Sequence, residues 1–151
     1  MIRVITTCLL LAVFSLLTVV PGGCASGGGA SAPSIQNLVG EWAVKTLGGK
    51  DISSLLPAGS KVPTLDFKPD GSVSGFAGVN RLSSKLNLAE LAKGQFSLSP
   101  AAMTMMAGPP ESMKVEQMFT EALNQARGLK LDGNTLSLTK DGSSLMSLVR
   151  K

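Results

Sequence analysis

The sequence predicts an α+β domain in which one main helix covers an antiparallel sheet. Three Asp-Gly or Gly-Asn turns separate short apolar runs, and a single longer segment has the spacing of an amphipathic helix. The turns are Pro69-Asp70-Gly71, Asp132-Gly133-Asn134 and Asp141-Gly142. Such pairs supply the positive φ angles of tight hairpins, so the strands that they join are expected to be antiparallel.

The strands are identified by apolar residues that alternate with polar ones around those turns. In chain order, the expected strands are residues 38–47, 64–67, 72–74, 129–131, 136–138 and 145–149. Residues 95–98 and the Met103 region add one or two more. Trp42, in the opening strand, is expected in the core, whereas an exposed Trp42 beside an apolar groove would indicate a partner site.

The helix is expected over residues 111–127. Pro109-Pro110 sets its start, and Gly128 offers the position just after its end. Its apolar positions recur at helical spacing: Val115, Met118, Phe119, Ala122, Leu123 and Ala126. This stripe must cover a sheet. Residues 87–94 form either a further turn or two of helix, with Asn87 as cap, or a loop.

The first 23 residues are expected to be a signal peptide. Arg3 precedes residues 4–20, which carry no charge, and Pro21-Gly22-Gly23 stand directly before Cys24. Small residues before a Cys resemble the bacterial lipobox, in which the signal is cut and the Cys is acylated, although Pro21 replaces the usual Leu. The sequence therefore predicts lipid attachment at Cys24, with plain secretion and an uncleaved anchor as alternatives.

Residues 24–34 are small and uncharged, so we expect a flexible Gly/Ser/Ala tether before a domain at residues 35–151. The tether spans roughly 17 to 19 Å, which keeps the domain close to its membrane. The expected location is the bacterial cell envelope, lipid-anchored and facing the periplasm, and a secreted or soluble periplasmic form is the alternative. Ala25 in place of Asp favours the outer membrane. The expected partners are the membrane, through the anchor, and an envelope protein or peptide.

Composition excludes several classes of function. The chain has no His and no Tyr, and its two cysteines, Cys8 and Cys24, are removed with the signal or acylated. The mature domain thus lacks the Ser-His-Asp triad, the Cys-His pair and the usual zinc ligands, and we expect no cofactor and no metal. The formal net charge of +4 is spread without runs, which argues against nucleic-acid binding.

An ordered set of motifs runs through the domain. The motifs are Leu38-Val39-Gly40-Glu41-Trp42, Pro63-Thr64-Leu65-Asp66-Phe67, Asp70-Gly71, Gly75-Phe76-Ala77-Gly78-Val79-Asn80-Arg81, Met103-Thr104-Met105-Met106-Ala107-Gly108, and Glu116, Phe119 and Leu123 in the helix. The set resembles the META or HslJ-like domain of bacterial envelope lipoproteins. The resemblance implies a small, strongly curved, barrel-like antiparallel sheet with one main α-helix packed on it. It also implies a role in stress or antibiotic tolerance.

The resemblance has two departures, because Val79 and Gly108 stand where many relatives have Cys. If those cysteines lie together in the family fold, losing both removes a disulfide and leaves no odd thiol. This agrees with a mature domain that has no thiol of its own.

The candidate site is the motif that contains Gly75, Gly78, Asn80 and Arg81, together with Thr104. Two Gly and an Asn suit a bulge, a positive φ or a close backbone approach. One interpretation is a structural corner in which Asn80 hydrogen-bonds the backbone and Arg81 pairs with a carboxylate. The other is that Asn80 and Arg81 border a small groove for a ligand or peptide.

Five methionines lie close together in the sequence: Met103, Met105, Met106, Met113 and Met118. Thioether sulfur selects Cu(I), but Met is also an adaptable core filler. The core interpretation is favoured because no His or Cys assists a metal.

An enzyme is not favoured. A carboxylate-based hydrolase needs two carboxylates facing one bond, and Asp66 and Asp70 lie near a hairpin, where Asp usually has a backbone role. Ser53-Ser54 and Ser83-Ser84-Lys85 lack the spacing of serine nucleophiles. The leading prediction is a non-catalytic envelope lipoprotein, with a periplasmic inhibitor or peptide-binding protein second and a hydrolase third.

Overall fold

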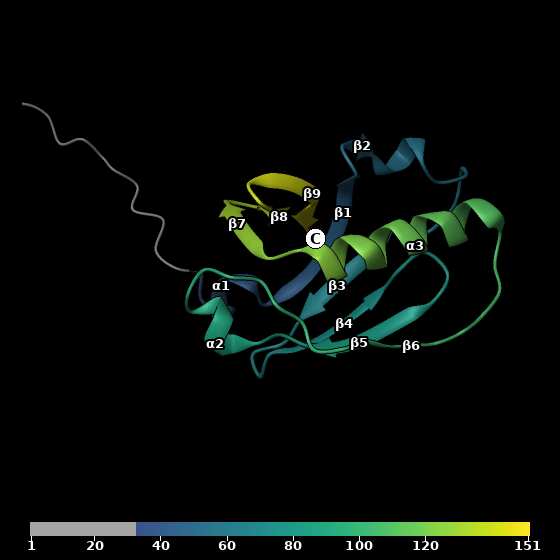
Figure 1. Ribbon diagram of the computed structural model, residues 1–151. Coiled ribbons are helices and arrows are strands. Elements are labelled where there is room, and N and C mark those ends of the chain that lie inside the picture. Colours follow the sequence, from purple (N-terminus) through teal and green to yellow (C-terminus); the bar gives the residue numbers. More distant parts are fainter. Residues whose placement is uncertain (1–32) are drawn as a thin grey trace, which may run out of the picture.

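The computed structural model describes residues 33–151, which include the whole of the predicted domain (Figure 1). The predicted signal peptide, the predicted acylation site Cys24 and most of the predicted tether lie outside these residues. Within them, no helix is long and apolar enough to cross a membrane.

An antiparallel sheet of nine strands forms the frame of the domain. The strands are β1 (Gly40–Leu47), β2 (Lys50–Asp51), β3 (Thr64–Phe67), β4 (Ser72–Phe76), β5 (Arg81–Lys85), β6 (Ala102–Met103), β7 (Gly128–Asp132), β8 (Thr135–Lys140) and β9 (Ser143–Arg150). Their order is β6-β5-β4-β3-β1-β9-β8-β7, with β2 paired to the end of β1. The β1–β9 pair therefore joins the two ends of the domain in the middle of the sheet.

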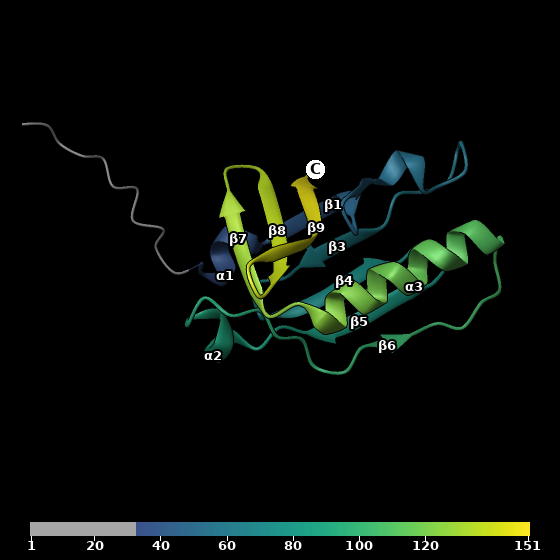
Figure 2. The ribbon, with the colours of Figure 1, turned by 45° about the horizontal axis from the view of Figure 1, so that its top comes forward.

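The sheet curls, and one main helix, α3 (Pro110–Gln125), packs on it, so the predicted fold class is confirmed (Figures 1 and 2). The curl does not close into a barrel, because β6 and β7 at its two edges do not pair with each other. Residues 95–99 lie between these edges. There Leu98 bridges Leu86, just after β5, and Gln95 bridges Gly128 at the start of β7.

The predicted hairpins are confirmed. β3 pairs with β4, β7 with β8, and β8 with β9, all antiparallel. Gly71, Gly133 and Gly142 in the connecting turns have φ angles of 82°, 54° and 81°. Each turn therefore places glycine where the backbone needs a positive φ.

Two strand predictions need correction, and two strands, β2 and β5, were not predicted. Leu38 ends a one-turn helix, α1 (Ile35–Leu38), so the opening strand begins later, at Gly40. Residues 95–98 make only isolated bridges, and of the one or two strands expected there, β6 alone forms. The sequence pattern also missed β5, because Arg-Leu-Ser-Ser-Lys has one apolar side chain and its outer positions face solvent.

The main helix is close to its predicted range. Its buried apolar residues are Val115, Phe119, Ala122 and Leu123. The expected role of Gly128 after the helix is wrong, because Ala126 already turns the chain with a ψ of 135° and Gly128 begins β7. Gly128 instead serves strand packing, since an ideal Cβ there would lie 2.6 Å from Thr139 Oγ1.

Two short helical turns complete the fold. The segment left open between helix and loop forms α2 (Leu88–Leu91), and Asn87 caps it by accepting from the backbone N of Ala89 and Glu90 at 3.1 and 3.2 Å. Residues Ile52–Ser54 form a single 3-10 turn, η1. Asp51 caps that turn by accepting from Ser53 N at 2.9 Å.

Trp42 lies in the core, as predicted, with an exposed fraction of 0%. Its Nε1 donates to Leu38 O at 2.7 Å, and the Arg150 guanidinium lies over its ring, 4.4 Å from the centroid. Arg150 also donates to Val39 O and Asn37 O at 2.6 and 2.7 Å. Trp42 and Arg150 therefore hold the chain around α1 against β9, and Trp42 is a core residue and not a partner site.

Candidate functional site

Asn80 is the centre of the candidate motif and lies in the loop between β4 and β5. It is 3% exposed, and its side-chain amide makes four hydrogen bonds. Nδ2 donates to Met106 O at 3.0 Å and to Glu116 Oε1 at 2.8 Å. Oδ1 accepts from Met106 N at 2.7 Å and from Thr104 Oγ1 at 2.9 Å. These include the backbone bonds that the structural interpretation of the motif predicts.

Glu116, on α3, completes this arrangement. It is 8% exposed, and its Oε2 accepts from Val79 N at 3.1 Å and from Asn80 N at 2.6 Å. No cation pairs with Glu116 within residues 33–151, so N–H donors offset the cost of burying it. We term Asn80, Thr104, Glu116 and the Met106 backbone the Asn80 network.

Gly78 allows this loop, and Gly75 allows strand β4, to approach its neighbours closely. An ideal Cβ on Gly78, where φ is 137°, would lie 2.9 Å from Ser112 O on α3. A Cβ on Gly75 would overlap Thr64 O on the neighbouring strand. Both positions therefore require glycine, and the glycines of the motif have a packing role.

Arg81 differs from its neighbour Asn80. Its backbone N donates to Thr104 Oγ1 at 3.0 Å, but the residue is exposed. The expected carboxylate partner is absent, because no ion pair within residues 33–151 involves Arg81. The guanidinium instead lines a hollow on the sheet, whereas Asn80 lines a different one. The two residues therefore do not border one common groove.

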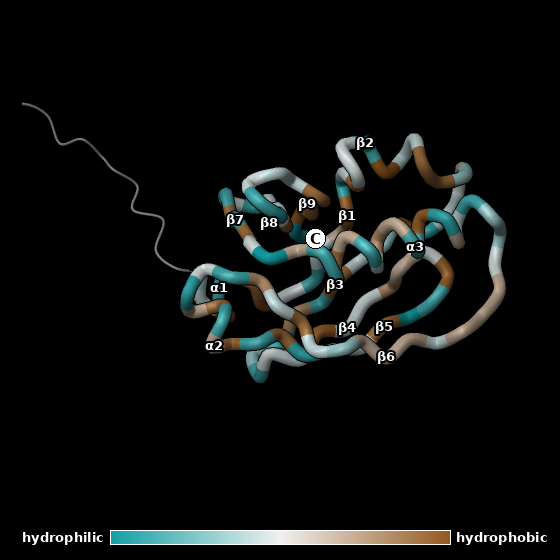
Figure 3. The backbone as a smooth tube through the Cα atoms, in the orientation of Figure 1, coloured by the Kyte–Doolittle hydropathy of each residue, from teal (hydrophilic) through white to brown (hydrophobic). Residues whose placement is uncertain are grey.

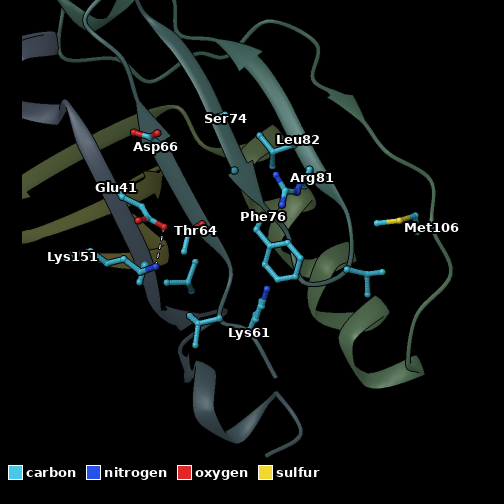
Figure 4. Close-up of a pocket in the computed structure, with 15 residues that line it drawn as sticks. Glu41, Lys61, Thr64, Asp66, Ser74, Phe76, Arg81, Leu82, Met106 and Lys151 are labelled. Carbon is cyan, nitrogen blue, oxygen red and sulfur yellow. Dashed lines mark hydrogen bonds and ion pairs between the residues drawn. The ribbon is translucent and has the colours of Figure 1, made fainter. Parts of the chain in front are cut away.

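The hollow that Arg81 lines, which we term the open-face hollow, has a volume of about 1150 Å³. It lies on the side of β1, β3, β4 and β5 that faces away from the core, where Thr64 and Asp66 alternate with the buried Leu65 (Figure 4). Residues that line it include Lys61, Thr64, Asp66, Phe76, Arg81 and Lys151.

Two carboxylates that were not predicted to lie near each other, Glu41 and Asp66, both line the open-face hollow. Glu41 and Asp66 are direct cross-strand partners on β1 and β3. Lys68 pairs with Asp66 at 2.7 Å, which raises the pKa of Lys68, and Lys151 pairs with Glu41 at 2.9 Å. A carboxyl group that acts as a general acid is usually kept protonated by apolar surroundings. The Asp66 side chain is 30% exposed and the Glu41 side chain is 47% exposed. Each pairs with a lysine, so both carboxylates belong to surface ion pairs.

Lys61 and Arg81 are cations of the open-face hollow that form no ion pair within the described residues. Phe76 is the cross-strand partner of Arg81, and Figure 4 shows its ring between Arg81 and Lys61. Val62 adds an apolar surface that is 38% exposed. This end of the hollow combines positive charge with an aromatic ring, which suits an anion that has an apolar part.

The hollow that Asn80 lines, which we term the methionine hollow, lies between the loop after β6 and helix α3. Its volume is about 740 Å³. Met103, Met105, Met106 and Met113 line it. Met105 is 97% exposed, Met106 54% and Met113 36%, so the predicted core role is wrong for these three. Met103 and Met118 do pack against the core. For Met105 and Met106 the physical reason is that Asn80 binds the Met106 backbone and holds the loop at the surface. Met113 lies on α3 outside the set of residues that the helix buries.

Other polar candidates serve the backbone. Asp70 accepts from Ser72 Oγ and Ser72 N at 2.7 and 3.0 Å, and these bonds lower the pKa of Asp70. Bonds from Ser53 likewise lower the pKa of Asp51. Ser84 Oγ donates to Ser99 O at 2.7 Å. In the part of the chain that the structure describes, no group of three His, Cys, Asp or Glu could hold a metal ion.

The two positions that depart from the family pattern are neighbours in space. An ideal Cβ on Gly108 would lie 2.5 Å from Val79 Cγ2 and 3.3 Å from Val79 Cβ. Val79 therefore fills the space in front of Gly108, and cysteines at both positions would be adjacent.

Fold and site together define a class: a small α+β domain in which a buried Glu-Asn pair joins the helix to a curled sheet, with a hollow on each side. The chain belongs to the META domain family, which matches residues 36–151. Curated protein sequences contain no match to this chain.

Solved structures share the fold. An NMR structure of a protein from Burkholderia xenovorans has a TM-score of 0.57 at 21% identity and covers 78% of this chain and 86% of that chain. Another NMR structure has a TM-score of 0.55 at 20% identity, covering 74% and 88%. A crystal structure of a DUF4847 family protein from Bacteroides vulgatus ATCC 8482 has a TM-score of 0.50 at 17% identity, covering 74% and 92%. Such low identities establish the fold alone.

Proposed function

We propose that this protein is a non-catalytic, lipid-anchored protein of the bacterial cell envelope that binds an acidic envelope protein or peptide through the open-face hollow. The observation that carries the proposal is the placement of Lys61 and Arg81, without ion-pair partners within the described residues, around Phe76. Charge complementarity would bring an acidic segment to these cations, and Phe76 would contact its apolar part.

The engagement of the carboxylates supports a non-catalytic role. Three N–H donors occupy Glu116, and lysines pair with Glu41 and Asp66. The sequence also contains no His to act as a general base.

Affinity capture from detergent-solubilised envelopes tests the binding site. We expect wild-type bait to retain an acidic partner that Lys61→Gln/Arg81→Gln loses. The matched control is Lys85→Gln/Lys130→Gln, which removes two exposed cations elsewhere and keeps the partner. Raised salt should release the partner, because exposed charges are screened. Equal capture by all three baits would contradict the proposed site.

Lipid attachment at Cys24 separates this proposal from the second candidate, a soluble periplasmic binding protein, which Pro21 in the lipobox favours. Cys24→Ala is expected to move the protein from the membrane fraction to the soluble fraction. Unchanged membrane retention would exclude the lipid anchor, and a soluble wild-type protein would support the second candidate.

The proposed role in stress or antibiotic tolerance rests on the family resemblance. Deleting the gene is expected to lower survival under heat or antibiotic, and wild-type protein should restore it. Lys61→Gln/Arg81→Gln should fail to restore survival if the open-face hollow carries the role. Full tolerance in the deletion strain would remove this part of the proposal.

A further inference from the structure

The methionine hollow has no part in the proposed binding function. Met103 ends β6, Met105 lies two residues later in the following loop, and Met113 lines the same hollow from the start of α3. Figure 3 shows the chain through β6 and the following loop as an apolar stretch. Met105 and Met113 are 97% and 36% exposed, whereas Met103 packs partly against the core and lines the hollow beside them. Because exposed apolar side chains forgo the free energy of burial, the two exposed thioethers beside Met103 need an explanation.

We propose that Met103, Met105 and Met113 bind Cu(I) in the methionine hollow. Soft thioether ligands select Cu(I), and a Met side chain has three rotatable bonds with which to close around an ion. The 97% exposure of Met105 leaves an open path for the metal. Thioethers release no proton on binding, so this ligand set works without the His and Cys that the mature domain lacks.

Asn80 positions this site without touching the metal. Its two bonds to the Met106 backbone hold the loop that carries Met105 over α3. The Met106 side chain itself is directed toward the strands of the open-face hollow in Figure 4, so we assign it no role as a ligand.

Two charged residues also line the methionine hollow. Glu116 is engaged by Asn80 and by the loop backbone, and is not free to bind a metal. Lys114 is an exposed cation, whose repulsion of a bound ion is weakened by solvent and salt. The thioethers are therefore the available ligands, and they favour Cu(I) over Zn(II) and Cu(II).

The experiment titrates the full chain with Cu(I) under reducing, oxygen-free conditions against a chromogenic Cu(I) chelator. Cys8→Ser and Cys24→Ser are introduced so that no thiol competes. The chain is expected to bind a single Cu(I), and equally at pH 5 and pH 7 because no ligand must lose a proton. A carboxylate ligand would make binding weaker at the lower pH.

Two Met→Leu variants of that chain provide the comparison. Replacing Met103, Met105 and Met113 by Leu, which nearly conserves volume, is expected to weaken Cu(I) binding at least tenfold, or about 1.4 kcal/mol. The control replaces Met118 and Met146 by Leu; neither residue lines the methionine hollow, so the affinity should be unchanged. Lys61→Gln/Arg81→Gln should also leave it unchanged, which separates this site from the open-face hollow.

NMR of the chain labelled with 13C at the methionine methyl groups supplies a second readout. On addition of Cu(I), the Met103, Met105 and Met113 methyl signals are expected to shift, and the Met118 and Met146 signals to stay. If the triple variant does not fold, Met105→Leu alone suffices, because this exposed side chain does not support the core. Failure of the cysteine-free chain to bind Cu(I), equal binding by the two Met→Leu variants, or shifts confined to Met118 and Met146 would overturn the proposal.

Discussion

The buried amide of Asn80 makes its four hydrogen bonds within the protein, and Asn80→Ala would leave Met106 and Glu116 groups without partners. We expect the free energy of unfolding to fall by about 3 kcal/mol, because buried groups lose their bonds. Asn87→Ala, which removes an exposed helix cap, should cost about 1 kcal/mol. Urea titrations of both variants measure the difference, and a smaller loss at Asn80 than at Asn87 would contradict the role of the network.

A second residue-scale prediction concerns Asp70. Bonds from Ser72 hold the pKa of Asp70 below its usual 3.8 in the folded protein. The ionised carboxylate therefore contributes stability above pH 3.8, and this contribution is lost as pH falls through the lower folded pKa. Asp70→Asn keeps an acceptor oxygen but does not titrate, so its unfolding temperature should fall less between pH 5 and pH 2. Equal slopes for wild type and variant would disprove the effect.

Individual residues were predictable where their signal is local. Asn80 follows Gly78 in a pattern typical of a corner, and its backbone bonds could be expected from that pattern. Glu116 lies 36 positions away, so its carboxylate could not be matched to Asn80 from spacing. The exposure of Met105 and Met106 was missed for the same reason, since the bonds that hold their loop come from Asn80.

Among the elements, the loop after β4 and the helix α3 are fitted to each other at Gly78. Gly78→Ala would place a Cβ 2.9 Å from Ser112 O at a φ of 137°, so we expect the free energy of unfolding to fall by about 3 kcal/mol or more. Gly49→Ala is the matched control, because Gly49 has a φ of 76° but nothing within 4 Å of its Cβ. It should cost about 1 to 2 kcal/mol from backbone strain alone. Equal losses in urea titrations would show that contact with α3 is unimportant.

Elements joined by tight turns could be predicted, and those held by distant contacts could not. The hairpins around Gly71, Gly133 and Gly142 follow from turn chemistry over a few residues. β5 has only Leu82 as a buried side chain and owes its register to β4 and β6. The curl was implied by family resemblance, because no local pattern encodes the bridge between Gln95 and Gly128.

At the scale of the whole molecule, the Asn80 network separates two surfaces with different chemistry. The open-face hollow is charged, and the methionine hollow is rich in thioethers. Composition revealed both kinds of side chain, and the alternation along β3 indicated an outward face. These side chains come together in two hollows only because β3, β4 and β5 pair and α3 packs on the sheet. Those contacts join residues far apart in the sequence, so no local pattern predicts them.

The contact between Val79 and Gly108 joins the β4–β5 loop to the segment before α3, and it allows a test of the whole arrangement. In Val79→Cys/Gly108→Cys the two Cβ atoms would start 3.3 Å apart, a few tenths of an ångström below the usual range of about 3.5 to 4.5 Å for disulfides. A small backbone shift should therefore permit the bond. Closing a loop of about 30 residues is expected to raise the free energy of unfolding by about 3 to 4 kcal/mol in the oxidised protein.

Urea titrations with and without reductant measure that gain within one protein, and Cys8→Ser and Cys24→Ser remove competing thiols. The reduced form should be less stable than wild type, because the Val79 methyl groups no longer fill the space in front of Gly108. Val79→Cys alone should show this loss without any response to reductant. Slow or absent disulfide formation in the folded double variant would show that the loop before α3 does not contact residue 79. The position of α3 on the sheet would then need revision.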